Sequence, residues 1–82
     1  MRTTIRLKIQ KEIDSATEKK ILKLKGSLIT NGYTDIVHID DEGTDYHINY
    51  FTLEAIKKEE VKTFIASYIQ EMNLASAIAL SE

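Results

Sequence analysis

The spacing of the apolar residues changes along this 82-residue chain, and that change constrains its fold more than any other feature. In the stretch TTIRLKIQ, residues 3–10, aliphatic side chains stand at every second position, at Ile5, Leu7 and Ile9. Such alternation predicts a strand that buries one face. The chain therefore opens with an element that needs a cover for its apolar side.

A helix is predicted next. The apolar positions now fall three or four apart, as in Leu24 and Leu28, which places them on one helical face. Ser15 and Glu18 have the spacing of a capping box, in which each side chain accepts a hydrogen bond from the backbone amide of the other residue. Asn31-Gly32 supplies the left-handed stop that ends many helices. These signals bound the helix at both ends.

A hairpin follows, because two β-branched and aromatic runs flank the acidic stretch DEG. We expect Val37 and Ile39 on its first strand to face the core, together with Tyr46, Ile48 and Tyr50 on its second. The pairing that joins these faces sets Ile39 opposite Tyr46 and Val37 opposite Ile48. The DEG stretch also suits a turn with a bulge, which would change that register.

A second helix is predicted over residues 59–72, EEVKTFIASYIQEM, where apolar residues recur at helical spacing. Its start stays open, because the preceding FTLEAIKK can prolong the strand or begin the helix at Thr52. The tail, residues 74–82, can form a short edge strand around Ile78 or continue the helix.

The resulting order is strand, helix, strand, strand, helix and, with the tail, strand. Helices joined to a mostly antiparallel sheet form an α+β sandwich, and right-handed crossovers place both helices on one face. The whole chain resembles a ferredoxin-like βαββαβ domain, with βαββα as the alternative if the last strand is absent. This resemblance is to a superfold that hosts many unrelated functions, so it implies no activity.

The length predicts a single domain over residues 1–82, too small to enclose a large cofactor. The chain has no cysteine, which excludes disulfides, thiolate zinc sites and cysteine nucleophiles. It shows no apolar run of about 18 residues and no signal-peptide core at its start. We expect a cytoplasmic protein without a membrane segment or a cofactor.

Charge is divided unevenly along the chain. Residues 1–25 carry eight Lys or Arg against three acidic residues, whereas residues 26–56 carry six acidic residues and no Lys or Arg. The acidic residues that we assign to partner binding are Asp35, Asp40, Asp41, Glu42 and Asp45. Fixed carboxylates can imitate spaced phosphates or attract a basic groove. The alternative is that they only protect an edge hairpin from pairing with a stray strand.

The uncovered sheet face is a second candidate surface. In the expected register it displays Arg6, Lys8, His38, His47, Asn49 and Phe51. His38 then lies opposite His47, and Asp40 opposite Asp45, a set that suits zinc or another first-row transition ion. The carboxylates would lie about 6.8 Å further along the strands, which makes closure on one ion difficult. Polar residues on the wet side of a hairpin are the simpler interpretation.

Nucleic-acid binding and catalysis find less support. RNA-recognition motifs share this topology and stack bases on two or three sheet-face aromatic residues, whereas the expected face offers only Phe51 beside His47. The acidic hairpin would also repel a phosphate backbone. The sequence contains no Ser–His–Asp order, glycine-rich phosphate loop or HExxH motif, so we expect no enzymatic activity.

One part of the first helix is ambiguous. Lys25 falls inside a wide apolar arc, between the direction shared by Ile21 and Leu28 and the direction shared by Leu22 and Ile29. Leu22 and Ile29 can pack against the second helix while Lys25 extends to solvent. Alternatively, they form a patch that contacts another protein.

Together these features predict a small non-enzymatic protein-binding module or inhibitor. Its acidic hairpin, residues 35–45, would be the main contact and the open sheet face the second, for a partner with a basic surface. Small size, an acidic tip and the absence of Cys and Pro also fit a phage-type viral inhibitor of a nucleic-acid enzyme, such as an anti-CRISPR protein. The alternatives are single-stranded nucleic-acid binding and divalent-metal binding through His38 and His47. The charge layout also permits a homodimer.

Overall fold

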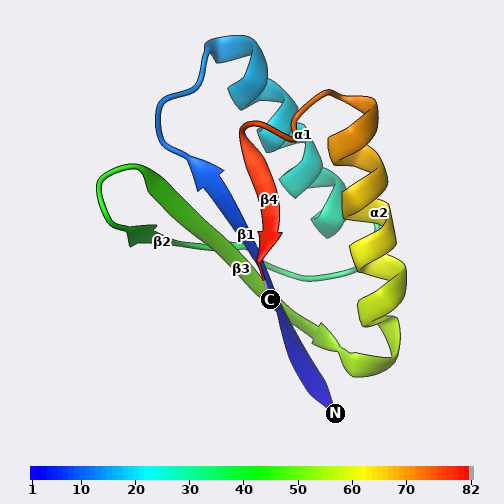
Figure 1. Ribbon diagram of the computed structural model, residues 1–82. Coiled ribbons are helices and arrows are strands. Elements are labelled where there is room, and N and C mark those ends of the chain that lie inside the picture. Colours follow the sequence, from blue (N-terminus) through cyan, green and yellow to red (C-terminus); the bar gives the residue numbers. More distant parts are fainter. Residues whose placement is uncertain (82) are drawn as a thin grey trace.

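The strands in the computed structural model, which describes residues 1–81, pair antiparallel in the order β2-β3-β1-β4 (Figure 1). Along the chain the elements are β1 (Arg2–Gln10), α1 (Ser15–Thr30), β2 (His38–Glu42), β3 (Tyr46–Glu54), the 3-10 turn η1 (Ala55–Lys57), α2 (Lys58–Glu71) and β4 (Ile78–Ser81). This is the predicted ferredoxin-like βαββαβ arrangement. The tail forms its last strand, which pairs with β1.

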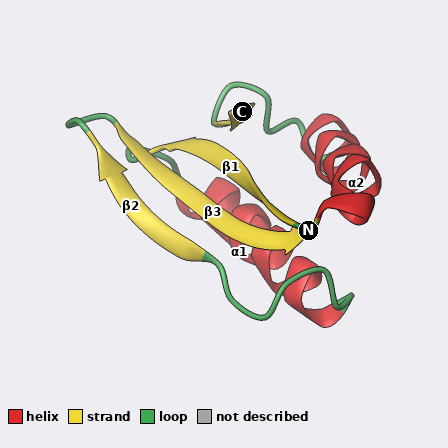
Figure 2. Cartoon of the chain, turned by 90° about the horizontal axis from the view of Figure 1, so that it is seen from below, coloured by secondary structure: helices red, strands yellow, loops and turns green. Residues whose placement is uncertain are grey.

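Both helices lie on one face of the sheet, and the apolar core fills the space between them and the strands (Figure 2). The buried side chains of this core are Ile5, Leu7, Ile9, Ile21, Leu24, Leu28, Phe51, Leu53, Val61, Ile65, Ile69, Leu74 and Ile78. At one edge of the sheet all five residues of β2 are exposed. The other face of the sheet is open to solvent.

Asp14, not Ser15, caps α1. Its Oδ1 accepts a hydrogen bond from the backbone amide of Thr17 at 2.8 Å, and this bond lowers the pKa of the Asp14 carboxyl. The predicted capping box of Ser15 and Glu18 is therefore wrong, since Ser15 is already the first helical residue. The predicted stop is confirmed, because Gly32 adopts a left-handed φ of +77° just after the helix.

The second helix keeps its predicted apolar stripe, with Val61, Ile65 and Ile69 in the core and Phe64 packed beside them. The segment whose assignment was open prolongs β3 as far as Glu54 and then forms the 3-10 turn. Since β3 is nine residues long, it spans the whole of β1 and forms the centre of the sheet with it.

The hairpin forms as predicted, but β3 turns the opposite face to the helices. Phe51 and Leu53 are buried, while Tyr46, Ile48 and Tyr50 lie on the open face. The physical reason lies in the side chains: Phe51 and Leu53 carry no polar atom, whereas a buried tyrosine needs a partner for its hydroxyl group. Enclosing the Phe–Leu pair and leaving both phenols in water avoids that requirement. The predicted orientation of the three outward residues is therefore wrong.

The register between β2 and β3 also differs from the prediction. His38 lies opposite Tyr50 and Ile39 opposite Asn49, where His47 and Tyr46 were expected. The cause is the position of the turn, which spans residues 43–45 instead of the expected DEG stretch. Gly43 opens this turn at φ +68°, a left-handed conformation that glycine adopts without steric cost.

Candidate functional site

The open face of the sheet carries an aromatic and aliphatic row between two charged rows. The central row comes from β3 and consists of Tyr46, Ile48 and Tyr50. Across the ladder, His38, Asp40 and Glu42 of β2 lie on one side, and Arg6, Lys8 and Gln10 of β1 on the other. Because cross-strand neighbours share a face, these nine side chains form one continuous surface, which we call the open face.

Two contacts order the aromatic residues of the open face. The rings of His38 and Tyr50 are stacked, with centroids 5.1 Å apart and an interplanar angle of 25°. Lys8 Nζ lies 4.4 Å from the centroid of the Tyr46 ring, within the range of a cation–π contact. A surface hollow on the open face is lined by Arg6, Asp40, Ile48 and Tyr50, among others. The face therefore combines fixed aromatic planes with charges of both signs.

Three of the residues predicted for this face lie on the other one. Phe51 is fully buried and Asn49 is 2% exposed, while His47 faces a cavity beside α1. Their orientation was predicted wrongly because the face of β3 that meets the core was misassigned by one residue. Arg6, Lys8 and His38 do lie on the open face, as expected.

The structure does not bring together the residues of the alternative metal site. His38 and His47 lie on opposite faces of the sheet, so their imidazoles cannot bind one ion, and Asp45 belongs to the turn. Within residues 1–81, no group of three or more His, Cys, Asp or Glu side chains converges in a way that could hold a metal.

Asp41 is compensated by a lysine from a distant part of the chain. Lys11 Nζ lies 3.2 Å from Asp41 Oδ1 and also donates a hydrogen bond to the carbonyl of Gly43 at 3.1 Å. The hydrogen bond and charge of Lys11 lower the pKa of the Asp41 carboxyl. His47 Nδ1 lies 3.3 Å from the same oxygen on the helix side. Asp41 therefore helps to hold the hairpin against the end of β1, through Lys11.

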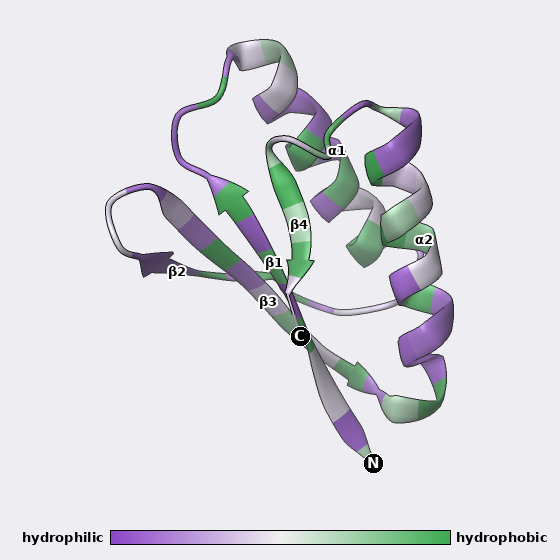
Figure 3. Cartoon of the chain, in the orientation of Figure 1, coloured by the Kyte–Doolittle hydropathy of each residue, from purple (hydrophilic) through white to green (hydrophobic). Residues whose placement is uncertain are grey.

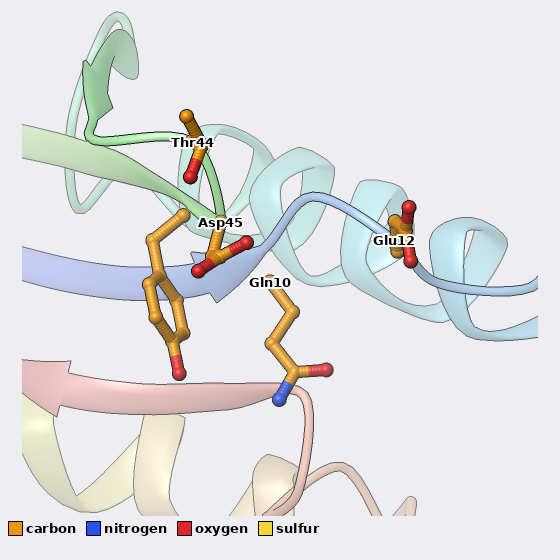
Figure 4. Close-up of a pocket in the computed structure, with 5 residues that line it drawn as sticks. Gln10, Glu12, Thr44 and Asp45 are labelled. Atoms are coloured by element: carbon orange, nitrogen blue, oxygen red, sulfur yellow. The ribbon is translucent and has the colours of Figure 1, made fainter.

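The remaining acidic residues lie in three places. Asp40 and Glu42 are exposed on the open face, and Asp35 is exposed in the loop before β2. Asp45 lies in the turn, beside a surface hollow that also involves Gln10 from the end of β1 (Figure 4). The acidic cluster of the sequence is thus divided, and only Asp40 and Glu42 share a surface with the aromatic row.

Lys25 donates a hydrogen bond from its ammonium group to Asn49 Oδ1 at 3.0 Å. Burial lowers the pKa of this ammonium group. The expectation that Leu22 and Ile29 pack against α2 is wrong, since they are 55% and 45% exposed. Leu22 instead borders a cavity of about 290 Å³ between α1 and the hairpin, which Ile39 also lines.

Tyr46 and Tyr50 are the site residues that sequence reasoning missed, with Ile48 between them. A signal for them was present: the neighbouring odd-numbered positions, Phe51 and Leu53, are the ones without polar atoms. Hydropathy therefore favours burial of Phe51 and Leu53 at the end of β3 toward α2, and the alternation of the strand would extend that preference back to Tyr46.

Comparison with protein-family models, with characterised proteins and with solved structures found no match to this chain. Among residues 1–81, no helix is long and apolar enough to span a membrane. The open face and its contacts therefore provide the basis for a functional proposal.

Proposed function

We propose that this protein is a small non-enzymatic binding domain that recognises another protein through its open face. The observation that carries the proposal is the row of Tyr46, Ile48 and Tyr50 on an uncovered sheet face, with Arg6 beside it. Tyrosine and arginine are enriched among the residues that contribute most to protein–protein affinity. Two aromatic rings with an aliphatic residue between them supply the apolar centre of such a contact, and the charged rows supply its polar rim.

The charges of the open face indicate what its partner should offer. Asp40 and Glu42 lie two residues apart along the outer strand, both exposed. Basic groups on a partner would complement this acidic side and accelerate encounter at low salt. The proposed acidic contact therefore consists of Asp40 and Glu42, and no longer of the whole segment of residues 35–45. Asp45 lies at the tip, and Asp41 is held by Lys11.

Within this class, an inhibitor of a nucleic-acid enzyme is the form of the proposal that uses the acidic side most directly. Carboxylates at regular spacing on a rigid strand can occupy a basic groove that otherwise accepts phosphates. A phage-type inhibitor, such as an anti-CRISPR protein, would act in this way without chemistry of its own.

The test is affinity capture from the cells that produce the protein, with two charge-matched variants. D40K/E42K reverses the acidic side of the open face, and E59K/E60K makes the same change of charge at the exposed start of α2. We expect a partner to be captured by the wild type and by E59K/E60K, and to be lost with D40K/E42K. Equal capture by D40K/E42K, with its melting temperature unchanged, would overturn the proposal.

Single-stranded nucleic-acid binding is the second candidate, and the outward position of Tyr46 and Tyr50 favours it. Exposed aromatic rings stack on bases, and Arg6 and Lys8 could contact phosphates. The carboxylate of Asp40, on the same face, would repel the phosphate backbone. Fluorescence anisotropy with labelled single-stranded RNA and DNA separates the two candidates. Salt-sensitive binding that Y46A/Y50A abolishes would favour nucleic acid, whereas absence of binding at low salt would exclude it.

A further inference from the structure

We infer that two copies of this protein pair through the free edge of β2 and join their sheets into one. Among residues 1–81, β2 pairs only with β3, and all five of its residues are exposed. The outer edge of such a strand presents unpaired backbone amides and carbonyls that a second strand can bond. This inference goes beyond the proposed function, because it concerns the strand edge and is tested on the purified protein alone.

Exposed apolar surface on the helix side of β2 would be buried by this pairing. Ile39 lies on that side and is 56% exposed, and Leu22 of α1 lines the same cavity between α1 and the hairpin. Figure 3, which is coloured by hydropathy, shows α1 and the mostly hydrophilic edge strand β2. A second strand placed beside β2 would cover Ile39 and remove apolar surface from water. The opposite edge of the sheet lacks this feature, since Ile78 at the start of β4 is buried in the core.

The side chains of β2 select one register. An antiparallel pair of identical strands has a two-fold axis, so each residue meets its partner symmetrically about one position. An axis through Ile39 sets the two Ile39 side chains against each other on the helix side. On the open face it sets His38 of each copy opposite Asp40 of the other, and this complementary pair forms twice.

The neighbouring registers are electrostatically worse. An axis through Asp40 would place two carboxylates in direct opposition, and like charges directly opposite each other destabilise a strand pair. An axis through His38 would place the two imidazoles opposite each other and would set Asp40 opposite Ile36, so the His–Asp pair would not form. The other acidic residues of β2 do not prevent the favoured register. Asp41 is already bound to Lys11 at 3.2 Å, and Glu42 would lie opposite residue 36, which is an isoleucine.

The occupant of this edge is therefore a second copy of the chain. The copy offers apolar side chains on the helix side and the complementary His–Asp pair on the open side. His38 can keep its stack on Tyr50, because cross-strand neighbours stand side by side on one face. Pairing would also place two open faces next to each other in one extended sheet.

Sedimentation equilibrium of the purified protein over a range of concentrations tests the pairing. We expect a reversible dimer in the wild type. I39K should raise its dissociation constant at least about tenfold, because two ammonium groups would meet across the axis. I56K is the matched control, since Ile56 is 92% exposed in η1, outside the proposed contact. A wild type that stays monomeric at every concentration, or a dimer that I39K leaves unchanged, would overturn the inference.

The register has its own test in a charge exchange. H38D alone would set two carboxylates opposite each other and should weaken the dimer. H38D/D40K sets a carboxylate opposite an ammonium group and should return the dissociation constant to within about threefold of the wild type, as for other complementary pairs. H38D and the double variant both lack the His38–Tyr50 stack, so the comparison isolates the charges. A double variant as weak as H38D would rule out this register.

Discussion

Lys25 of α1 donates its hydrogen bond to the buried side-chain oxygen of Asn49 on β3, at 3.0 Å, and so joins the first helix to the hairpin. This pair explains why an amide lies on the core-facing side of β3. The oxygen of Asn49 is satisfied by a cation whose own ammonium group is only partly withdrawn from water.

The Lys25–Asn49 pair should show strong coupling in a double-mutant cycle. K25M leaves the Asn49 oxygen buried without this partner and should lower the free energy of unfolding by about 1–3 kcal/mol. Replacing both residues, in K25M/N49L, should return the stability close to the wild-type value or above it, because no buried polar group is then left unpaired. Urea unfolding of the four proteins measures this coupling, and additive effects would contradict it.

The orientation of β3 can be tested by comparing adjacent residues. F51A should lower the free energy of unfolding by about 3–5 kcal/mol, since Phe51 is fully buried. Y50L, one position away on the open face, should change it by about 0.5 kcal/mol or less. Thermal unfolding followed by circular dichroism measures both. A Y50L loss as large as that of F51A would mean that Tyr50 faces the core.

Asp41 should make stability depend on pH in the acidic range. Lys11 lowers the pKa of the Asp41 carboxyl below its usual 3.8, so the unfolded chain binds more protons than the folded one between the two values. The stability from Asp41 is therefore complete above pH 3.8 and is lost as the pH falls through the lowered pKa. We expect D41N to melt at a lower temperature than the wild type at pH 6 and at the same temperature at the acid end.

The control for this pH dependence is D35N, which removes a carboxyl from the loop before β2 and leaves the Lys11 contact in place. Its melting temperature should follow that of the wild type through the acidic range. A D41N protein that follows the wild type in the same way would show that the Lys11 contact does not contribute.

Two glycine-to-alanine changes should act in opposite directions. G43A places a side chain at φ +68° and should destabilise the protein by about 1–2 kcal/mol. G26A lies inside α1 with open space around it and should stabilise the protein by about 0.5–1 kcal/mol, because alanine favours helix. Chemical denaturation resolves both signs. A stabilising effect of G43A would mean that residue 43 does not adopt a positive φ in the turn.

The N-terminal cap of α1 should make substitutions at the adjacent residues Asp14 and Ser15 differ in their effect on stability. D14A removes the side chain that accepts from Thr17 and should lower the melting temperature clearly, whereas S15A should lower it little because Ser15 is inside the helix. A larger fall in melting temperature for S15A than for D14A would show that Ser15, and not Asp14, caps the helix.

The sequence alone determined the order of the first three strands and the two helices, together with the apolar stripes of both helices. These depend on local periodicity: Ile5, Leu7 and Ile9 alternate, and Val61, Ile65 and Ile69 recur at helical spacing whatever surrounds them. The stop at Gly32 was equally local, since it requires only a residue that tolerates positive φ.

Only the tertiary structure decided which residues form the surface. Both faces of β3 carry apolar side chains, so its alternation permits two orientations, and packing against α1 and α2 selects Phe51 and Leu53. Tyr46 and Tyr50 become a surface as a result. Asp41 looked uncompensated along the chain because its cation, Lys11, comes from a segment 30 positions earlier. Charge balance and burial depend on distances in space, and those are set when the helices and strands pack together.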